Sequence, residues 1–302
     1  MSTGLRGVFA IAQLPCNERG DFVWEDFERE CDWTVRAGAH GLVWPVMASE
    51  FTAISFPERV QGMRLAVSAV GKRIPVVIGV ADTSKAGAVA LAEEAGKAGA
   101  DAIIAMPPWA TKLVSHELVE DFYRSIASAA GVPVIIQNCN PPLGSSLPGS
   151  YVVELCKKIT LVQYLKEEKS PEAHSVSEVI DLAGPEVKGV FSGSGGMWLI
   201  PDHKRGVCGN MPANTLADVD AQIWDLMEVG KEAEARRLHN IKLVFENVLR
   251  GMPGRRGRKE VMVRRGIFSY AASRNQGIQD MDEVDRAEFE YGYTLLEPYF
   301  RA

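Results

Sequence analysis

The chain has 302 residues, of which 46% are hydrophobic, and a formal net charge of −6. This length suits one large core, or a barrel with an appendage, and the acidic balance gives no reason to expect nucleic acid as a partner. No apolar run reaches the roughly 18 residues that a membrane span needs, and the first six residues lack the apolar segment of a secretory signal. We therefore expect a soluble, cytoplasmic protein with no membrane partner.

The cysteines and histidines give no sign of a metal site or a disulfide framework. The five cysteines form no CxxC pair, and the five histidines form no HxxxH pair or Cys/His cluster. Scattered cysteines in odd number are typical of reduced thiols in the cytoplasm. We expect no bound metal and no cofactor.

Short apolar, β-rich runs alternate with longer amphipathic runs along most of the chain. Continuous apolar runs are typical of strands that are buried on both faces. The predicted strands are Gly7–Leu14, Gly41–Val46, Val76–Gly79, Ala102–Met106, Pro133–Gln137, Leu161–Lys166, Lys188–Ser192 and Val207–Met211. The predicted helices between and after them are Trp24–Arg36, Phe56–Val70, Lys85–Ala98, Ser115–Ala127, Pro148–Lys157, Pro171–Leu182 and Leu216–Val229, and the connection after the seventh strand is short and Gly-rich.

Eight strands, each followed by a crossover, predict a parallel sheet closed into a (β/α)₈ TIM barrel over residues 1–230. An open doubly wound sheet would normally carry a Gly-rich phosphate loop after its first strand, and residues 13–17 (QLPCN) are not one. Residues 231–302 are expected to form helices packed on the barrel, at Glu232–Leu249, Arg258–Ala272 and Arg286–Tyr299. We interpret the basic run Arg250–Arg265 as a solvated face or subunit contact rather than as an anion site.

Catalytic groups of such barrels lie at the carboxyl ends of the strands, and Lys166 is the sharpest candidate there. It follows the apolar run Leu161–Leu165. Burying a charged lysine is costly, whereas the neutral amine that burial favours is the nucleophile that condenses with a ketone. The alternative is a lysine that reaches from the rim of the barrel into water.

Several segments resemble the dihydrodipicolinate synthase / N-acetylneuraminate lyase family of Schiff-base aldolases and dehydratases. The similarity covers most of the chain and lies in DAIIAMPPW (101–109), GVPVIIQN (131–138), YLKEE (164–168), SGSGG (192–196) and GVCGN (206–210). The resemblance implies that Lys166 forms the Schiff base with a 2-oxo acid. It also implies a homodimer or homotetramer.

The departures from the family pattern narrow the expected reaction. Met47 and Ala48 replace two threonines whose hydroxyls help to bind the substrate carboxylate, so backbone N–H groups near Ala48 would have to hold it. Gln137 replaces the acid/base tyrosine, and an amide cannot relay a proton as a phenol does. The pattern Ser49-Glu50, Gln137 and Lys166–Glu168 resembles the subset of 2-keto-3-deoxy-pentonate dehydratases, although that subset tends to carry acidic residues where this chain has SGSGG.

Glu168 is the candidate for the acid/base group that replaces the tyrosine. Side chains alternate along a strand, so Tyr164, Lys166 and Glu168 share one face and Glu167 points toward the helices. We expect an apolar barrel mouth to raise the pKa of Glu168 toward neutrality. The alternative is that Glu168 begins the loop and caps a helix or pairs with Lys169.

The weaker candidates would contact the rest of the substrate. Ser49 and Gln137 could position a water or the substrate hydroxyls, or could be hydrogen-bonded core. Ser192, Ser194 and Asn210 are placed where the far end of a substrate would lie. The expected function is dehydration of a 2-keto-3-deoxy sugar acid. The alternatives are a pyruvate-releasing aldolase and, from another class, an inactive barrel that binds 2-oxo acids.

Overall fold

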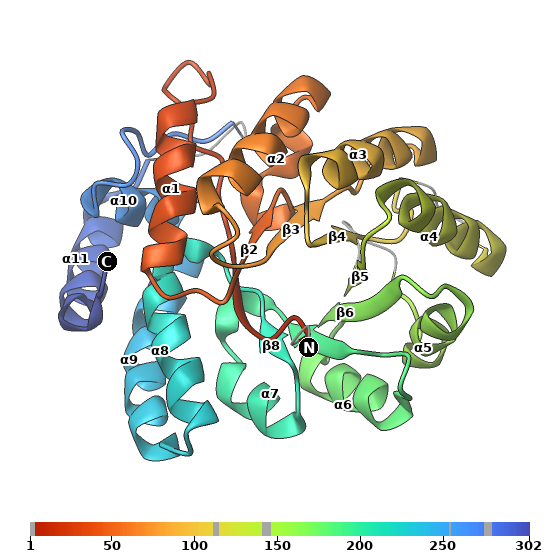
Figure 1. Cartoon of the computed structure of the whole chain (residues 1–302). Helices are drawn as coiled ribbons and strands as arrows, with labels where there is room; N and C mark the ends of the chain where they lie inside the picture. Colours follow the sequence, from red (N-terminus) through yellow and green to blue (C-terminus); the bar gives the residue numbers. More distant parts are fainter. Residues whose placement is uncertain (1–3, 111–114, 141–145, 254, 275–279) are drawn as a thin grey trace.

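In the computed structural model, eight parallel strands close in sequence order into a barrel, surrounded by helices (Figure 1). The structure describes residues 4–110, 115–140, 146–253, 255–274 and 280–302. The strands are β1 (Gly7–Ile11), β2 (Gly41–Trp44), β3 (Val76–Gly79), β4 (Ala102–Ala105), β5 (Val134–Cys139), β6 (Val162–Glu168), β7 (Gly189–Ser192) and β8 (Gly209–Asn210). The predicted fold class is confirmed, and all eight predicted strands are present, β3 with the predicted bounds and the others with one or both ends shifted.

The helices between the strands follow the predicted order. They are α1 (Trp24–Arg36), α2 (Phe56–Val70), α3 (Lys85–Ala98), α4 (His116–Ala130), α5 (Gly149–Lys158), α6 (Glu172–Leu182), α7 (Leu199–Arg205) and α8 (Ala217–Glu228), with short 3₁₀ turns η1 (Met47–Ser49), η2 (Phe51–Ala53), η3 (Ser194–Gly196) and η4 (Asn214–Leu216) among them. We predicted no helix at α7, because its seven residues are too few to show a helical period.

Local chemistry explains where several helices begin and end. The Ser115 hydroxyl accepts a hydrogen bond from the Leu118 N–H at the start of α4, and the Ser84 hydroxyl accepts one from the Gly87 N–H at the start of α3. Helices α3 and α4 end at Gly99 and Gly131, whose φ angles of 86° and 67° are the left-handed values that glycine adopts without strain.

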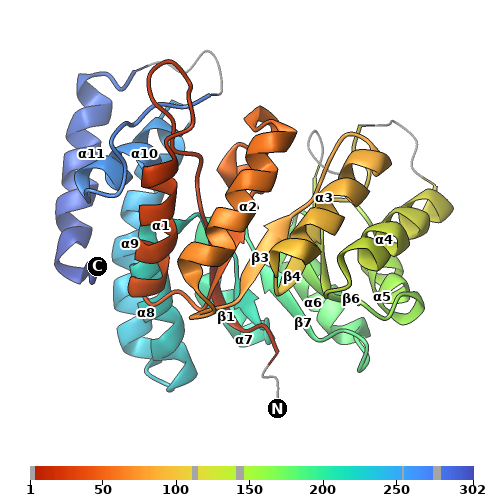
Figure 2. The same cartoon turned by 45° about the horizontal axis from the view of Figure 1, so that its top comes forward.

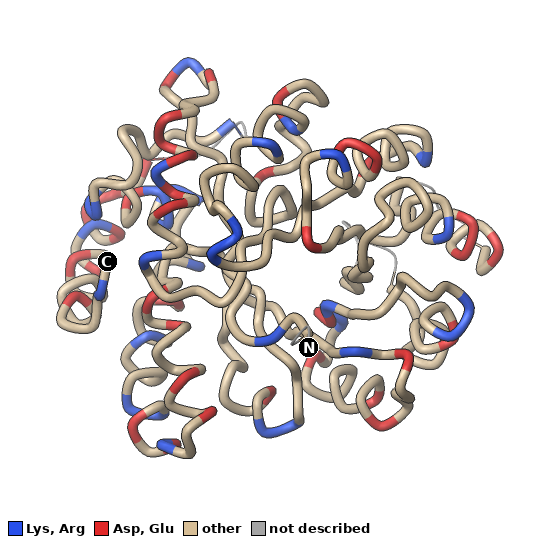
Figure 3. The backbone as a smooth tube through the Cα atoms, viewed as in Figure 1, with Lys and Arg blue, Asp and Glu red and all other residues tan. Residues whose placement is uncertain are grey.

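The centre of the barrel is filled by side chains. Phe9, Val43, Ile104, Tyr164 and Phe191 belong to one buried cluster inside the strands. A larger apolar cluster lies between the strands and helices α1 to α6. Charged residues of both signs are spread over the outer helices (Figure 3). This packing closes the barrel interior, so a substrate can enter only at an end.

The C-terminal segment forms α9 (Glu232–Gly251), α10 (Arg256–Arg264) and α11 (Glu283–Leu296), followed by the 3₁₀ turn η5 (Glu297–Tyr299). These helices lie together beside α8 and α1 (Figure 2). Their apolar residues, including Phe245 and Tyr293, share one cluster with Leu199 of α7 and Trp224 of α8. Helix α10 ends at Arg264, well before the predicted Ala272. The division between residues 230 and 231 stays a prediction.

No helix in the described part of the chain combines the length and hydropathy that a bilayer crossing requires.

Candidate active site

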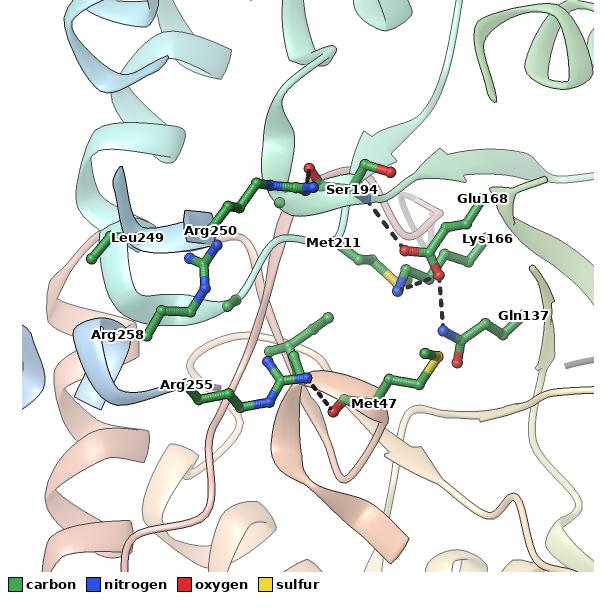
Figure 4. A pocket seen from close by; sticks show the side chains of 14 residues that line it. Met47, Gln137, Lys166, Glu168, Ser194, Met211, Leu249, Arg250, Arg255 and Arg258 are labelled. Carbon is green, nitrogen blue, oxygen red and sulfur yellow. Dashed lines mark hydrogen bonds and ion pairs between the residues drawn. The ribbon is translucent and has the colours of Figure 1, made fainter. Parts of the chain in front are cut away.

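A cavity of about 440 Å³ opens where the carboxyl ends of the strands meet the C-terminal helices (Figure 4). Its lining combines apolar side chains with polar and charged ones. The lining residues are Ile11, Met47, Ala48, Gln137, Lys166, Glu168, Ser194, Gly195, Met211, Ala213, Leu249, Arg250, Arg255 and Arg258. A reactant held here would contact groups from β5, β6, η1, η3, α9 and α10.

Lys166 and Glu168 form an ion pair inside this cavity, with 2.9 Å between Nζ and Oε2. The Lys166 side chain is only 4% exposed. Gln137 lies beside Lys166 in the β5–β6 register, and its Nε2 donates a hydrogen bond of 2.9 Å to the same Oε2 atom. The other carboxylate oxygen accepts a hydrogen bond from the Ser194 N–H at 3.3 Å. The strand thus continues straight past Lys166, as the predicted alternation required.

The electrostatic state of Glu168 differs from our expectation. Burial raises the pKa of this carboxyl, as predicted, but the neighbouring Lys166 ammonium and the hydrogen bonds from Lys166, Gln137 and Ser194 outweigh burial. The net effect is a pKa below the usual value. Our prediction of a raised pKa for Glu168 was therefore wrong for the site without substrate. It considered the apolar surroundings of the carboxyl but not the Lys166 ammonium 2.9 Å away.

Glu167 points away from the cavity. Its carboxylate accepts hydrogen bonds from Asn138 Nδ2 at 2.9 Å and from the Lys169 N–H at 2.7 Å. Burial raises its pKa to about 7, against the lowering effect of these hydrogen bonds. Asn138 also bonds both polar groups of the Leu147 backbone, so this side of the strand is tied to the chain just before α5. Glu167 is therefore a buried carboxyl on the face of β6 that points away from the cavity.

Three of the six predicted substrate-binding residues line the cavity: Ala48, Gln137 and Ser194. The Ser194 hydroxyl donates a short hydrogen bond to the Glu172 carboxylate. Ser49, Ser192 and Asn210 do not line the cavity.

These three residues are hydrogen-bonded within the core. Ser49 donates from Oγ to the carbonyl of Ala12 at 2.5 Å and accepts from the Val46 N–H at 3.2 Å. Asn210 donates from Nδ2 to Ser192 Oγ at 2.8 Å. The structure therefore places all three as supports of the neighbouring turns.

Glu50, which the sequence pattern grouped with Ser49, is paired with the C-terminal segment. Lys259 of α10 lies 2.6 Å from a Glu50 carboxylate oxygen, and both side chains are fully buried. The Lys259 ammonium also donates to the Leu14 carbonyl at 2.7 Å, and Ser273 donates a short hydrogen bond to Glu50. This buried pair fastens α10 over the turns after β1 and β2.

Sequence reasoning missed the arginines of the cavity wall. Arg250, Arg255 and Arg258 line it, although we interpreted their basic run as a solvated face or subunit contact. The end of α9 and the start of α10 bring these three side chains to the cavity wall, and the subunit contact stays a prediction. The one available signal was the density of arginines itself.

Residues 4–278 match the model of the dihydrodipicolinate synthetase family. The chain belongs to this family. It is 25% identical over 295 residues to L-2-keto-3-deoxyarabonate dehydratase of Azospirillum brasilense, which covers 97% of this chain and 95% of that protein. It is 27% identical over 224 residues to the 4-hydroxy-tetrahydrodipicolinate synthase of Thermodesulfovibrio yellowstonii, over 74% of this chain and 75% of that protein.

The fold is shared with solved structures of the dihydrodipicolinate synthetase family. The E. coli K12 prophage protein YagE, solved in complex with pyruvate, superposes with a TM-score of 0.88 at 21% identity, over 98% of this chain and 99% of that one. The synthase of Methylacidiphilum fumariolicum superposes with a TM-score of 0.87 at 20% identity, over 97% and 96%. As a member of this family, the chain is a lyase of the Schiff-base-forming class.

Proposed function

We propose that this lyase dehydrates a 2-keto-3-deoxy sugar acid through a Schiff base on Lys166. The observation that carries the proposal is the buried Lys166–Glu168 pair at the open end of the barrel, with Gln137 bonded to the same carboxylate. The Azospirillum relative, a dehydratase matched over nearly its whole length, supports the choice of reaction. No cofactor enters the scheme, because the iminium is itself the electron sink.

The ion pair suits the first step, in which the amine must be neutral. The Lys166 ammonium can pass its proton to the Glu168 carboxylate, 2.9 Å away, and the free amine then attacks the C2 ketone of the substrate. Attack gives a carbinolamine, and protonated Glu168 returns its proton to the carbinolamine hydroxyl. That hydroxyl leaves as water, which yields a protonated imine between Nζ and C2 and leaves Glu168 as a carboxylate again. The positive charge of the imine takes the place of the lost ammonium beside Glu168.

Glu168 then serves as base and afterwards as acid. The iminium makes a C3 proton acidic, and the Glu168 carboxylate removes it, leaving a neutral enamine. Without a cation beside it, the carboxyl keeps its burial, which raises its pKa, and it becomes a proton donor. It protonates the departing C4 hydroxyl as the C3–C4 double bond forms, so one water is lost and the iminium returns. Hydrolysis of that iminium frees Lys166.

The surrounding residues hold this arrangement. Gln137 and the Ser194 N–H orient the two carboxylate oxygens of Glu168. Ala48 lies in the cavity wall at η1, where backbone N–H groups at the start of the turn would hold the C1 carboxylate. Aldol cleavage with release of pyruvate would use the same iminium but would take the proton from the C4 hydroxyl rather than from C3.

Borohydride trapping tests the proposal. With pyruvate, reduction should fix a covalent adduct on Lys166, located by peptide mass spectrometry, and Lys166→Ala should fold normally and trap nothing. Lys169→Ala is the matched control, since Lys169 lies outside the cavity lining and should not affect trapping.

A screen of 2-oxo-3-deoxy acids, scored separately for dehydration and pyruvate release, then assigns the reaction. An adduct on another lysine, or no turnover in the whole screen, would contradict the proposal, and the second result would favour an inactive 2-oxo-acid-binding barrel.

A further inference from the structure

The side of the cavity opposite the lysine is formed by three arginines. Figure 4 shows Arg250, Arg255 and Arg258 entering the cavity from the side across from Lys166, with Arg250 reaching to Ser194 and Arg255 to Met47. Arg250 belongs to α9, Arg255 directly precedes α10 and Arg258 lies in its first turn. None of them takes part in the Schiff-base steps described above.

The carboxylates that pair with these arginines do not neutralise all of their positive charge. Arg250 and Arg258 share one carboxylate, that of Glu246: Arg258 Nη2 lies 2.5 Å and Arg250 Nε 3.2 Å from its Oε1. Arg250 also donates from Nη2 to the Ser194 carbonyl at 2.5 Å. Within the described part of the chain, the lining contains four cationic side chains, these three and Lys166, and one carboxylate, that of Glu168.

Arg255 is the most informative member of the group. Its Nη2 donates a hydrogen bond to the Met47 carbonyl at 2.8 Å, and no carboxylate of the described residues forms an ion pair with it. The nearest acidic influence is Glu50, which is already paired with Lys259. Burial lowers the pKa of Arg255, and the neighbouring Arg258 lowers it further. Among the described residues, this half-buried guanidinium facing a cavity bonds a carbonyl and has no carboxylate paired with it, whereas such groups normally have an anion.

We propose that these arginines bind an anionic group at the end of the substrate remote from C2. This inference rests on the proposed function, and it narrows the substrate class to 2-oxo acids that carry a second acid group, either a carboxylate or a phosphate. Guanidinium groups match both anions with paired N–H donors, and a partly water-excluded wall strengthens such contacts. Two parts of the cavity therefore have different roles. Lys166 condenses with the C2 ketone, and the three arginines bind the anionic group at the other end of the substrate.

Paired ligands of equal length test the inference. Calorimetry would compare 2-oxoadipate with 2-oxohexanoate for the carboxylate, and 2-oxo-3-deoxy-6-phosphogluconate with 2-oxo-3-deoxygluconate for the phosphate. At least one anionic ligand should bind about 10- to 100-fold more tightly than its neutral-ended partner, the range expected for charge-assisted hydrogen bonds. Arg255→Gln should remove most of that preference, and Arg250→Gln, at a more exposed position, serves as a second variant should Arg255→Gln misfold. Arg264→Gln is the control, because Arg264 pairs with Glu290 outside this cavity.

The outcomes separate this inference from the proposed chemistry. Borohydride trapping with pyruvate, which has no second acid group, should fall far less in Arg255→Gln than diacid binding does, because for pyruvate Arg255 only supports the Met47 carbonyl of η1. If the variant loses pyruvate trapping as severely as diacid binding, the arginines hold the C1 carboxylate and the inference is overturned. Equal affinities within both ligand pairs would also overturn it, while leaving Lys166 chemistry intact. Absence of any Lys166 adduct, with the anion preference retained, would instead reject the proposed chemistry and keep the anion site.

Discussion

Replacing Glu168 by Gln removes one ionisable group from the proposed site while preserving its shape. The variant can still accept a hydrogen bond from the Ser194 N–H, but it can neither take a proton from C3 nor return one to the C4 oxygen. General acid–base catalysis contributes about 10²- to 10⁴-fold, so kcat should fall by that factor, equivalent to about 3–5 kcal/mol in the barrier.

Trapping at Lys166 should survive the same substitution. Water can carry the protons of iminium formation, and removal of the carboxylate 2.9 Å from Nζ also removes the partner that holds the ammonium in place. Two measurements are therefore needed. One is the steady-state kcat on the best 2-oxo-3-deoxy acid, and the other is the yield of borohydride adduct at Lys166 with pyruvate. Loss of turnover with intact trapping is the expected pattern.

Glu167→Gln is the matched control, one residue away on the opposite face of β6. Glu167 bonds Asn138 and the Lys169 N–H outside the cavity, so this variant should keep kcat within a few-fold of wild type, with lower thermal stability. If Glu167→Gln is inactive and Glu168→Gln is active, the reasoning from strand alternation and from the ion pair fails. The proton-transfer group would then have to be sought at waters held by the loop after β2.

Three further predictions concern the strand-five residue, the assembly and the pH dependence of stability. Gln137→Tyr should raise aldol activity with pyruvate, because the phenol supplies the proton relay that the amide lacks, and unchanged aldol rates would refute this reading of the position. The protein should self-associate as a homodimer or homotetramer, so a light-scattering mass near the 33.0 kDa of one chain at micromolar concentration would contradict that expectation. His239 is buried, with Nε2 3.1 Å from the Gly196 carbonyl oxygen, and burial lowers its pKa to about 4. The unfolded chain therefore binds a proton more readily below pH 6.5, so the wild type should lose about 2 kcal/mol of unfolding free energy at this site between pH 7 and pH 5. In urea titrations His239→Gln should lose correspondingly less over that range, and parallel losses in both proteins would refute the assignment.

The sequence by itself determined the barrel and the position of its reactive lysine, because both depend on local signals. Apolar runs bounded by glycine turns predict buried parallel strands in order, and the end of the sixth run places Lys166 at the open end of the barrel. Alternation along that one strand also separated Glu168 from Glu167, since both residues belong to a single extended segment.

Only the tertiary structure decided what surrounds that lysine. The state of Glu168 depends on an ion pair together with contacts from β5 and from η3, which no local pattern records. Hydrogen bonds within the core hold three of the predicted substrate-binding residues, Ser49, Ser192 and Asn210. The end of a strand has one face toward the cavity and one toward the helices, and the conformation of the following turn decides which side chains reach the cavity. The arginines come from helices more than 80 residues beyond Lys166 in the chain, and the buried Glu50–Lys259 pair helps to fasten that segment over the barrel. Charge density along a sequence cannot distinguish a face turned to water from one turned to a cavity, because that difference is set by how distant segments pack.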